Sequence, residues 1–168
     1  MSFWQNFFLF AQDWIVNFSY LGIFLVSLIG TSTILLPFPI YLIIFFSEGL
    51  GLNPFLVGII AGIGSAVGEA TGYALGYGGR KLLKKKYKKW FRIAEKWFKK
   101  NGFVTIFIFA LTPLPDDIVG IIGGMTKYEI KKFFLASALG KIILCLLIAY
   151  SGHLIVPYFK EFTGMLVW

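Results

Sequence analysis

The sequence has little of the chemistry that builds disulfides or metal centres. It holds one cysteine and one histidine among 168 residues, so it can form no internal disulfide, and a Cys/His metal cluster is excluded. Cys145 lies in an apolar run, which favours a packing role. Charged residues are also scarce, at 14%, against about a quarter in typical soluble domains. We therefore expect no metal and no other cofactor.

Basic residues are missing from the first half of the chain, although its net charge is +8. No Lys or Arg precedes Arg80, whereas eleven fall between Arg80 and Lys100, and a second short basic loop spans residues 127–132. Because Lys and Arg in short loops mark the cytoplasmic side of a membrane, we expect both basic segments there and the uncharged loop 49–53 outside. Residues 1–17 lack the basic start of a secretory signal, so we expect the chain to be inserted intact.

Long apolar runs are what the sequence has in excess. Hydrophobic residues make up 58% of the chain and the mean hydropathy is +0.79, values that belong to membrane proteins. Runs near 19–47, 54–79, 103–125 and 133–157 are each long enough to cross roughly 30 Å of hydrocarbon. We therefore predict one integral, multi-pass membrane domain over residues 1–168, located in the cell membrane.

Two proline pairs interrupt these runs. Pro37 and Pro39 divide residues 20–46, and Pro113 and Pro115 divide the run after residue 103. Because proline removes a backbone donor and clashes with the preceding turn, each pair should end a helix. We predict two hairpins, each returning to the side from which it entered and each followed by a transmembrane helix, at 54–79 and at Lys132 to about Tyr150.

The two predicted halves have opposite orientations by the charge rule. The fold class is therefore an all-α membrane protein built as an inverted repeat of two opposed re-entrant hairpins, each followed by a transmembrane helix, plus amphipathic helices. Such repeats place a substrate site near the midplane, between broken helices. Residues 2–18 either lie at the outer interface as an amphipathic helix or begin the first span.

The helix predicted over 54–79 should be central in the bundle. Asn53 and Pro54 suit its N-cap and first position. Small residues at four-residue spacing let a neighbouring backbone come close, which is the main means of helix association in lipid. The glycines in this stripe are Gly64, Gly68, Gly72 and Gly76.

Residues 80–100 interleave basic and aromatic side chains. This pattern predicts an amphipathic cytoplasmic helix lying on anionic lipid, and because it is tethered between spans it favours lipid headgroups over nucleic acid as the partner. The cations expected to contact anionic lipid are Lys84, Lys85, Lys88, Lys89 and Arg92.

Four ionisable residues are expected within the membrane: Glu69, Asp116, Asp117 and Lys141. Charges there are costly and usually pair or line an aqueous path. Asp116 and Asp117 also suit a plain capping role at a half-helix start. Glu69 suits a structural hydrogen bond or ion pair with a neighbouring helix, and Lys141 suits a buried salt bridge with an acid. Three acids and one lysine would leave a groove net negative, so a phosphate could pass only if an acid bound a proton or cation.

The residues at 68–76, 101–103, 123–125 and 133–140 resemble those of the DedA family, also called the VTT or SNARE-associated Golgi protein domain. The resemblance covers roughly residues 20–155. It implies two opposed re-entrant hairpins and a link to lipid scrambling, to recycling of polyprenyl-phosphate carriers and to proton-coupled membrane physiology. The acid of this pattern falls on Glu69.

The chain also departs from that pattern. Many bacterial members have an acid in the first hairpin and two arginines at the second, whereas here Pro37-Phe38-Pro39-Ile40 is uncharged and the second break carries Asp116 and Asp117. The break is closer to archaeal and eukaryotic members. An arginine-clamped phosphate site is therefore not carried over.

These observations favour lipid translocation, a scramblase- or flippase-like movement of phospholipid or polyprenyl-phosphate headgroups along a midplane polar groove. A proton- or ion-coupled transporter of small solutes and a non-transporting membrane scaffold are the alternatives. No nucleophile and base at catalytic spacing are visible, so we expect no enzyme activity. A homo-oligomer is left open.

Overall fold

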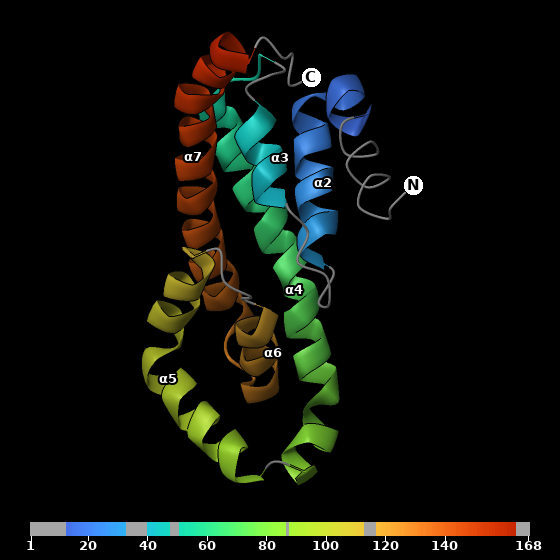
Figure 1. Ribbon diagram of the computed structural model, residues 1–168. Coiled ribbons are helices and arrows are strands. Elements are labelled where there is room, and N and C mark those ends of the chain that lie inside the picture. The colour runs from blue at the N-terminus through green and yellow to red at the C-terminus, as the bar shows by residue number, and fades with distance from the viewer. Residues whose placement is uncertain (1–12, 33–39, 48–50, 87, 113–116, 164–168) are drawn as a thin grey trace.

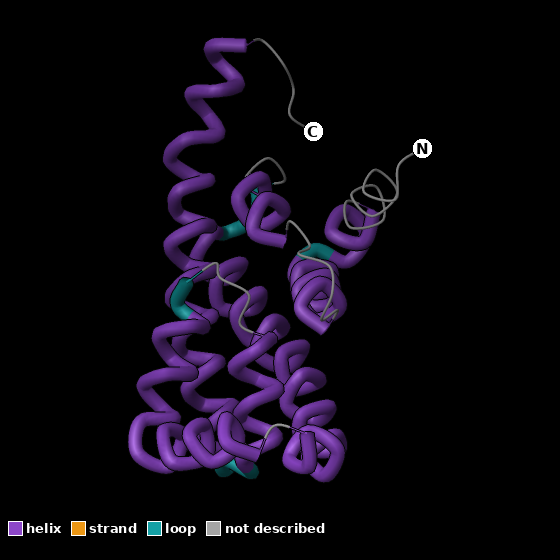
Figure 2. Tube along the Cα trace, turned by 60° about the horizontal axis from the view of Figure 1, so that its bottom comes forward, coloured by secondary structure: helices purple, strands orange, loops and turns teal. Residues whose placement is uncertain are grey.

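The computed structural model describes residues 13–32, 40–47, 51–86, 88–112 and 117–163. Within those ranges the chain is helical apart from short turns and contains no strand (Figure 2). This agrees with the predicted all-α membrane class. The helices are α2 (Tyr20–Ser32), α3 (Ile40–Phe46), α4 (Pro54–Lys86), α5 (Lys88–Ala110), α6 (Asp117–Thr126) and α7 (Ile130–Thr163).

Two long helices, α4 and α7, run antiparallel through the molecule and pack against each other (Figure 1). Their segments Pro54–Arg80 and Ile130–Tyr158 are long and apolar enough to cross a membrane. The predicted cap of α4 is confirmed, because the Asn53 side chain accepts a hydrogen bond from the Phe55 amide at 2.9 Å. The last helix extends to Thr163, well past the predicted end at Tyr150, because its apolar sequence continues. Pro157 lies inside this helix and does not end it.

The other helices flank this pair. In Figure 1, α2 runs down from the end of the molecule where the chain begins, and α3 returns toward the same end. At the opposite end, α5 rises to mid-height and α6 descends again. α2 packs on α4, while α6 packs between α4 and α5. The residues between α2 and α3, and between α5 and α6, lie outside the described ranges.

Glycines of α4 let these neighbours approach closely. A Cβ added at Gly64 would lie 2.6 Å from the Phe24 carbonyl oxygen of α2, and one at Gly76 would lie 2.0 Å from that of Ile121 in α6. Gly68 likewise faces α2, and Gly72 lies against α6 near Gly120. The stripe therefore divides between two partners, its first half facing α2 and its second half facing α6.

The basic segment 80–100 is not the separate helix that we predicted. Its described residues belong to the end of α4 and the start of α5, and α5 continues without a break through Asn101 and Gly102. Gly102 is needed for packing, because a Cβ there would lie 2.5 Å from the Tyr128 ring. The Asn-Gly pair therefore marks a close contact inside a helix rather than a helix end.

The described part of the N-terminal segment, residues 13–18, forms a short helix. Ser19 has a φ of 48° and turns the chain before α2 begins. A Cβ at Gly22 would lie 2.3 Å from the Trp14 carbonyl oxygen, so this helix folds back on the start of α2. Residues 13–18 are thus not a straight extension of α2.

Candidate functional site

Four polar side chains meet in the interior where α3, α4 and α7 come together. They are Tyr41, Glu69, Ser137 and Lys141, and we call them the buried charge cluster. The Lys141 ammonium lies 4.0 Å from Glu69 Oε1 and donates a hydrogen bond to the Tyr41 hydroxyl at 3.1 Å. The Ser137 hydroxyl donates to Glu69 Oε2. Each carboxylate oxygen of Glu69 therefore faces a partner on α7.

Glu69, Ser137 and Lys141 of the cluster are buried, and Tyr41 is partly buried. The Glu69 side chain is 4% exposed and that of Lys141 is 1% exposed. Burying a carboxylate and an ammonium costs several kcal/mol per ion, which only close pairing and hydrogen bonding offset. Removing one partner should therefore be far more costly than neutralising both.

The two long helices fix the geometry of the cluster. Ser137 and Lys141 are four residues apart, so they lie on one face of α7. That face approaches α4 closely, because a Cβ at Gly62 would lie 2.5 Å from Ile142 Cα. The cluster separates two apolar cores, one containing Ala61 and Cys145 and the other containing Tyr73 and Phe133.

The cluster lies about halfway along both candidate spans. Glu69 is eleven residues from the end of the span at Arg80, and Lys141 is eleven residues from the start of the other at Ile130. At 1.5 Å per residue, eleven residues cover about 16 Å, which is half of a hydrocarbon core of roughly 30 Å. In a membrane crossed by these two segments, the ion pair would lie at the depth where a charge is most costly.

Hydroxyl groups continue the polar region on the other side of α4. Thr31 of α2 donates to the Ser65 carbonyl at 3.1 Å, and Thr71 donates to the Ser32 carbonyl at 3.3 Å. Ser65 lies one helical turn before Glu69 on α4. Two hydrogen bonds therefore join the end of α2 to α4, one just before Glu69 and one just after it in the sequence.

Of the four predicted intramembrane ionisable residues, the structure brings Glu69 and Lys141 together. Asp117 begins α6, but its side chain lies outside what is described, as does Asp116. Arg92 of α5 is exposed. The remaining predicted residues whose side chains fall outside the described ranges are Pro37, Pro39, Pro113, Pro115, Lys84, Lys85, Lys88 and Lys89. Their roles stay predictions.

Two members of the cluster were missed by sequence reasoning. Ser137 could have been found from its spacing, because it lies four residues before Lys141 on a helix. Tyr41 carries the hydroxyl of an otherwise apolar heptapeptide, α3. Only the meeting of three helices reveals that this hydroxyl accepts from Lys141. Among the described residues, no group of three His, Cys, Asp or Glu could hold a metal ion.

Comparison with known proteins gives one family and two relatives. The model of the VTT domain matches residues 36–154. An "alkaline phosphatase-like protein" of Lactococcus lactis subsp. lactis is 30% identical over 73 residues, which are 44% of this chain and 34% of that protein. Its counterpart in subsp. cremoris is 29% identical over the same shares. The match thus spans about a third of these relatives. No solved structure is significantly similar.

Proposed function

Because the chain belongs to the VTT domain, or DedA, family of membrane proteins, we propose that it moves lipid headgroups across the membrane past the buried charge cluster. The observation that carries this proposal is the buried Glu69–Lys141 pair, which lies about halfway along two apolar helices. Ionisable residues inside a membrane are rare and mostly serve substrate or ion pathways.

The hairpins belong to the same proposal. α2 with α3, and α5 with α6, are re-entrant hairpins that enter from opposite faces, and each is followed by a spanning helix, α4 or α7. The paths of these helices in Figure 1 support this inverted repeat. The basic segments at 80–100 and 127–132 lie on the cytoplasmic side, as the positive-inside rule requires. Broken helices that meet near the midplane would supply the polar surface that a headgroup needs.

In this proposal the Glu69–Lys141 ion pair keeps the pathway closed. In the closed arrangement Glu69 holds Lys141 and Ser137, and α4 and α7 pack tightly beside them. Protonation of Glu69 would weaken its attraction to the ammonium, which frees Lys141 to meet a headgroup phosphate. Proton binding and lipid movement are thereby linked. The lipids carried are an anionic phospholipid or a polyprenyl phosphate, and the basic segment at 80–100 gathers anionic lipid at the entry side.

Lipid exchange in reconstituted vesicles tests the proposal. Liposomes with a fluorescent phospholipid, with and without a pH gradient, should show leaflet exchange with the intact chain. Glu69→Gln should still allow exchange but abolish its dependence on the pH gradient, because the neutral amide resembles the protonated acid and leaves Lys141 free at every pH. Asp13→Asn removes an exposed carboxylate far along the chain from the cluster and should leave exchange unchanged.

Three results would contradict it. Absence of exchange with or without the gradient would exclude lipid translocation by this chain alone. Solute flux that follows the proton gradient while lipid stays in place would favour a small-solute transporter. Full cellular activity of the Glu69→Gln/Lys141→Met double variant, which removes both members of the pair, would favour a scaffold whose basic surface binds lipid or partners.

We also propose that the chain is not an enzyme, although its relatives are named alkaline phosphatase-like. The one hydroxyl that contacts a carboxylate in the cluster is that of Ser137, whose residue is 0% exposed. A phosphate ester could not reach it in this arrangement. Phosphate release from a lipid phosphate, lost in Ser137→Ala, would contradict this.

A further inference from the structure

Two buried hydroxyl groups in the described chain have no hydrogen-bond partner. They are those of Ser27 in α2 and Ser65 in α4, and both residues are 0% exposed. Buried polar groups usually find a partner, because a hydrogen bond left unmade inside a protein forfeits the interaction with water. The buried Ser137 hydroxyl, for example, donates to Glu69. The two serines without a partner therefore need a physical explanation.

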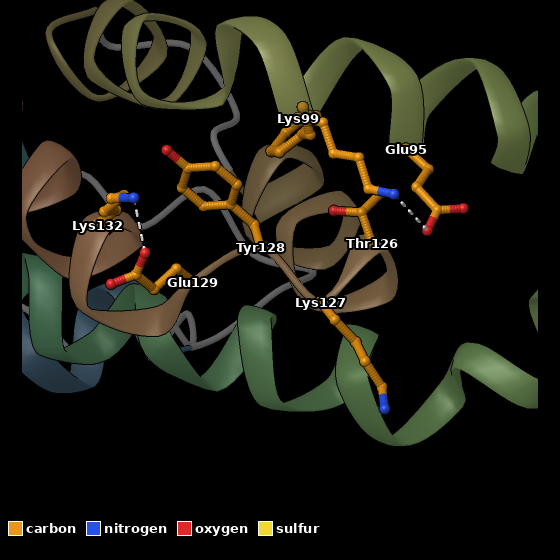
Figure 3. A pocket seen from close by; sticks show the side chains of 8 residues that line it. Glu95, Lys99, Thr126, Lys127, Tyr128, Glu129 and Lys132 are labelled. Atoms are coloured by element: carbon orange, nitrogen blue, oxygen red, sulfur yellow. Dashed lines mark ion pairs between the residues drawn. The ribbon is translucent and has the colours of Figure 1, made fainter.

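The cavity between α5 and the turn that joins α6 to α7, of about 260 Å³, is a separate feature. Figure 3 shows that its charged groups are paired, because Lys99 lies 3.7 Å from Glu95 and Lys132 lies 2.8 Å from Glu129. The Lys127 side chain points away from both pairs. Since the paired groups satisfy one another, this cavity gives less reason to expect a ligand than the two serines do.

Ser27 and Ser65 lie close together, across the contact of α2 with α4. The Thr31 hydroxyl lies 2.8 Å from the Ser27 carbonyl oxygen and 3.1 Å from that of Ser65, so it joins the two backbones. A Cβ added at Gly64 would lie 3.2 Å from the Cβ of Ser27. The two serines are therefore at the same level of the helix bundle.

This level is also that of the buried charge cluster. Ser65 lies one helical turn before Glu69, on the same side of α4. A Cβ added at Gly62 would lie 2.5 Å from Ile142 Cα. Gly62 is three residues before Ser65, and Ile142 directly follows Lys141. Helices α2 and α7 therefore approach neighbouring turns of α4, and the two serines lie next to the Glu69–Lys141 pair along that helix.

The two hydroxyls make the closed arrangement less stable than it would be without them. In this arrangement α2 and α4 pack tightly, since a Cβ at Gly68 would lie 2.5 Å from the Leu28 carbonyl oxygen. A group that enters when these helices separate can accept a hydrogen bond from each serine. The interaction missing in the closed arrangement is then gained only while the pathway is open. Interactions of this kind favour passage, because they stabilise the open state more than the closed one.

The charges at this level favour an acceptor that carries negative charge. Among the described side chains, these charges are those of Glu69 and Lys141. When Glu69 is protonated, as in the proposed function, the ammonium and the two serine hydroxyls are three donors around one point. A phosphodiester offers acceptor oxygens and no donor, and its hydrogen bonds with an ammonium are strengthened by charge. It therefore matches this set of donors.

We propose that the hydroxyls of Ser27 and Ser65 bind the phosphate of a lipid headgroup when α2 separates from α4, together with the Lys141 ammonium. This inference deepens the proposed function and rests on it for the movement of lipid. It adds two residues that contact the headgroup, and it places the path of the headgroup along the contact of α2 with α4.

Removing both hydroxyls should change stability and lipid exchange in opposite directions. Ser27→Ala/Ser65→Ala should raise the thermal unfolding midpoint in detergent by about 2–6 °C, because no hydroxyl without a partner stays buried at this contact. The same variant should slow the exchange of fluorescent phosphatidylglycerol in liposomes by about fivefold or more, as expected for the loss of at least one hydrogen bond to the phosphate. A purely structural role would lower the midpoint and the exchange rate together.

Two further variants isolate this effect. Ser151→Ala removes an exposed hydroxyl that donates to the Leu147 carbonyl inside α7, so it corrects for the higher helix propensity of alanine. It should raise the midpoint by less and leave exchange unchanged. In the Glu69→Gln background, where exchange is independent of the pH gradient, the double serine substitution should slow exchange by the same factor, because the hydroxyls act on the headgroup and not on the proton.

The outcomes separate the two proposals. Exchange by Ser27→Ala/Ser65→Ala at the rate of the intact chain would overturn this inference and leave the proposed function standing. A lower unfolding midpoint would also overturn it, since the hydroxyls would then have partners inside the closed protein. Inhibition of exchange by millimolar inorganic phosphate would overturn the lipid headgroup as occupant in favour of free phosphate. Absence of exchange by the intact chain would overturn both proposals.

Discussion

At the scale of single residues, the most costly feature of the described chain is one buried ion pair. Glu69 and Lys141 are almost fully buried, and each has a hydrogen-bonding neighbour in the buried charge cluster, Ser137 for the carboxylate and Tyr41 for the ammonium. A buried pair of this kind is weakly stabilising as a whole, whereas either member alone is strongly unfavourable. The pair is therefore best examined by removing one partner and then both.

Lys141→Met should lower the free energy of unfolding by about 3–5 kcal/mol, because the Glu69 carboxylate loses the ammonium that offsets its burial. Glu69→Gln/Lys141→Met should recover most of that loss, since no unbalanced charge remains. Thermal or denaturant unfolding in detergent measures both. Lys131→Met, at an exposed position of the same helix, should change stability by no more than about 0.5 kcal/mol. A double variant whose loss equals the sum of the single losses would show that the two residues are not coupled.

At the scale of helices, α4 acts as the common neighbour of α2, α6 and α7. Its glycines allow this, because several backbones approach to a distance at which even a methyl group would overlap them. Glycine inside a helix costs roughly 0.5–1 kcal/mol relative to alanine, so only those glycines at a close contact should be needed. Gly76 lies at such a contact, whereas Gly78, two residues later, does not.

Gly76→Ala should destabilise the chain by about 1–3 kcal/mol, as overpacking does in well-packed interiors, because the new Cβ would lie 2.0 Å from the Ile121 carbonyl oxygen. Gly78→Ala is the matched control, since a Cβ there has nothing within 4 Å. It should stabilise the helix by up to about 1 kcal/mol. Unfolding midpoints of the two variants should therefore move in opposite directions, and a shared direction would show that α6 does not pack on α4 as described.

At the scale of the whole molecule, the basic segments lie at the end of the long helices that is opposite the start of α4. The helix at residues 13–18 and the turn at Gly51 are at the end where α4 begins, and the α6–α7 turn with Lys131 is near the other end (Figure 1). Lysine-rich loops stay in the cytoplasm during insertion. The molecule should therefore have one orientation.

Cysteine labelling tests that orientation in a Cys145→Ser background. A membrane-impermeant maleimide should label Asp13→Cys in intact cells and Lys131→Cys only in inverted vesicles, because the two exposed positions lie on opposite sides. The unmodified chain is the control, because its Cys145 is 0% exposed and should stay unlabelled in both intact cells and inverted vesicles. Labelling of Asp13→Cys and Lys131→Cys from the same side would contradict the assignment of both basic segments to the cytoplasm.

Several features were predictable because they depend on local sequence. The Asn53 cap and Pro54 start are set by neighbouring residues, so the helix begins where the sequence indicates. The two long apolar segments also follow from composition along the chain. Residues 80–100 were misjudged because Asn101 and Gly102 look like a break, whereas Gly102 is helical and accommodates Tyr128.

By itself, the sequence determined that this chain is a helical membrane protein with a few costly charges in its apolar runs. Only the tertiary structure decided which charges meet. Lys141 could have faced Asp116, Asp117 or Glu69 by sequence alone, and the antiparallel contact of α4 with α7 brings it to Glu69. Local propensity depends on residues within a turn or two, whereas a pair 72 positions apart depends on how two helices pack.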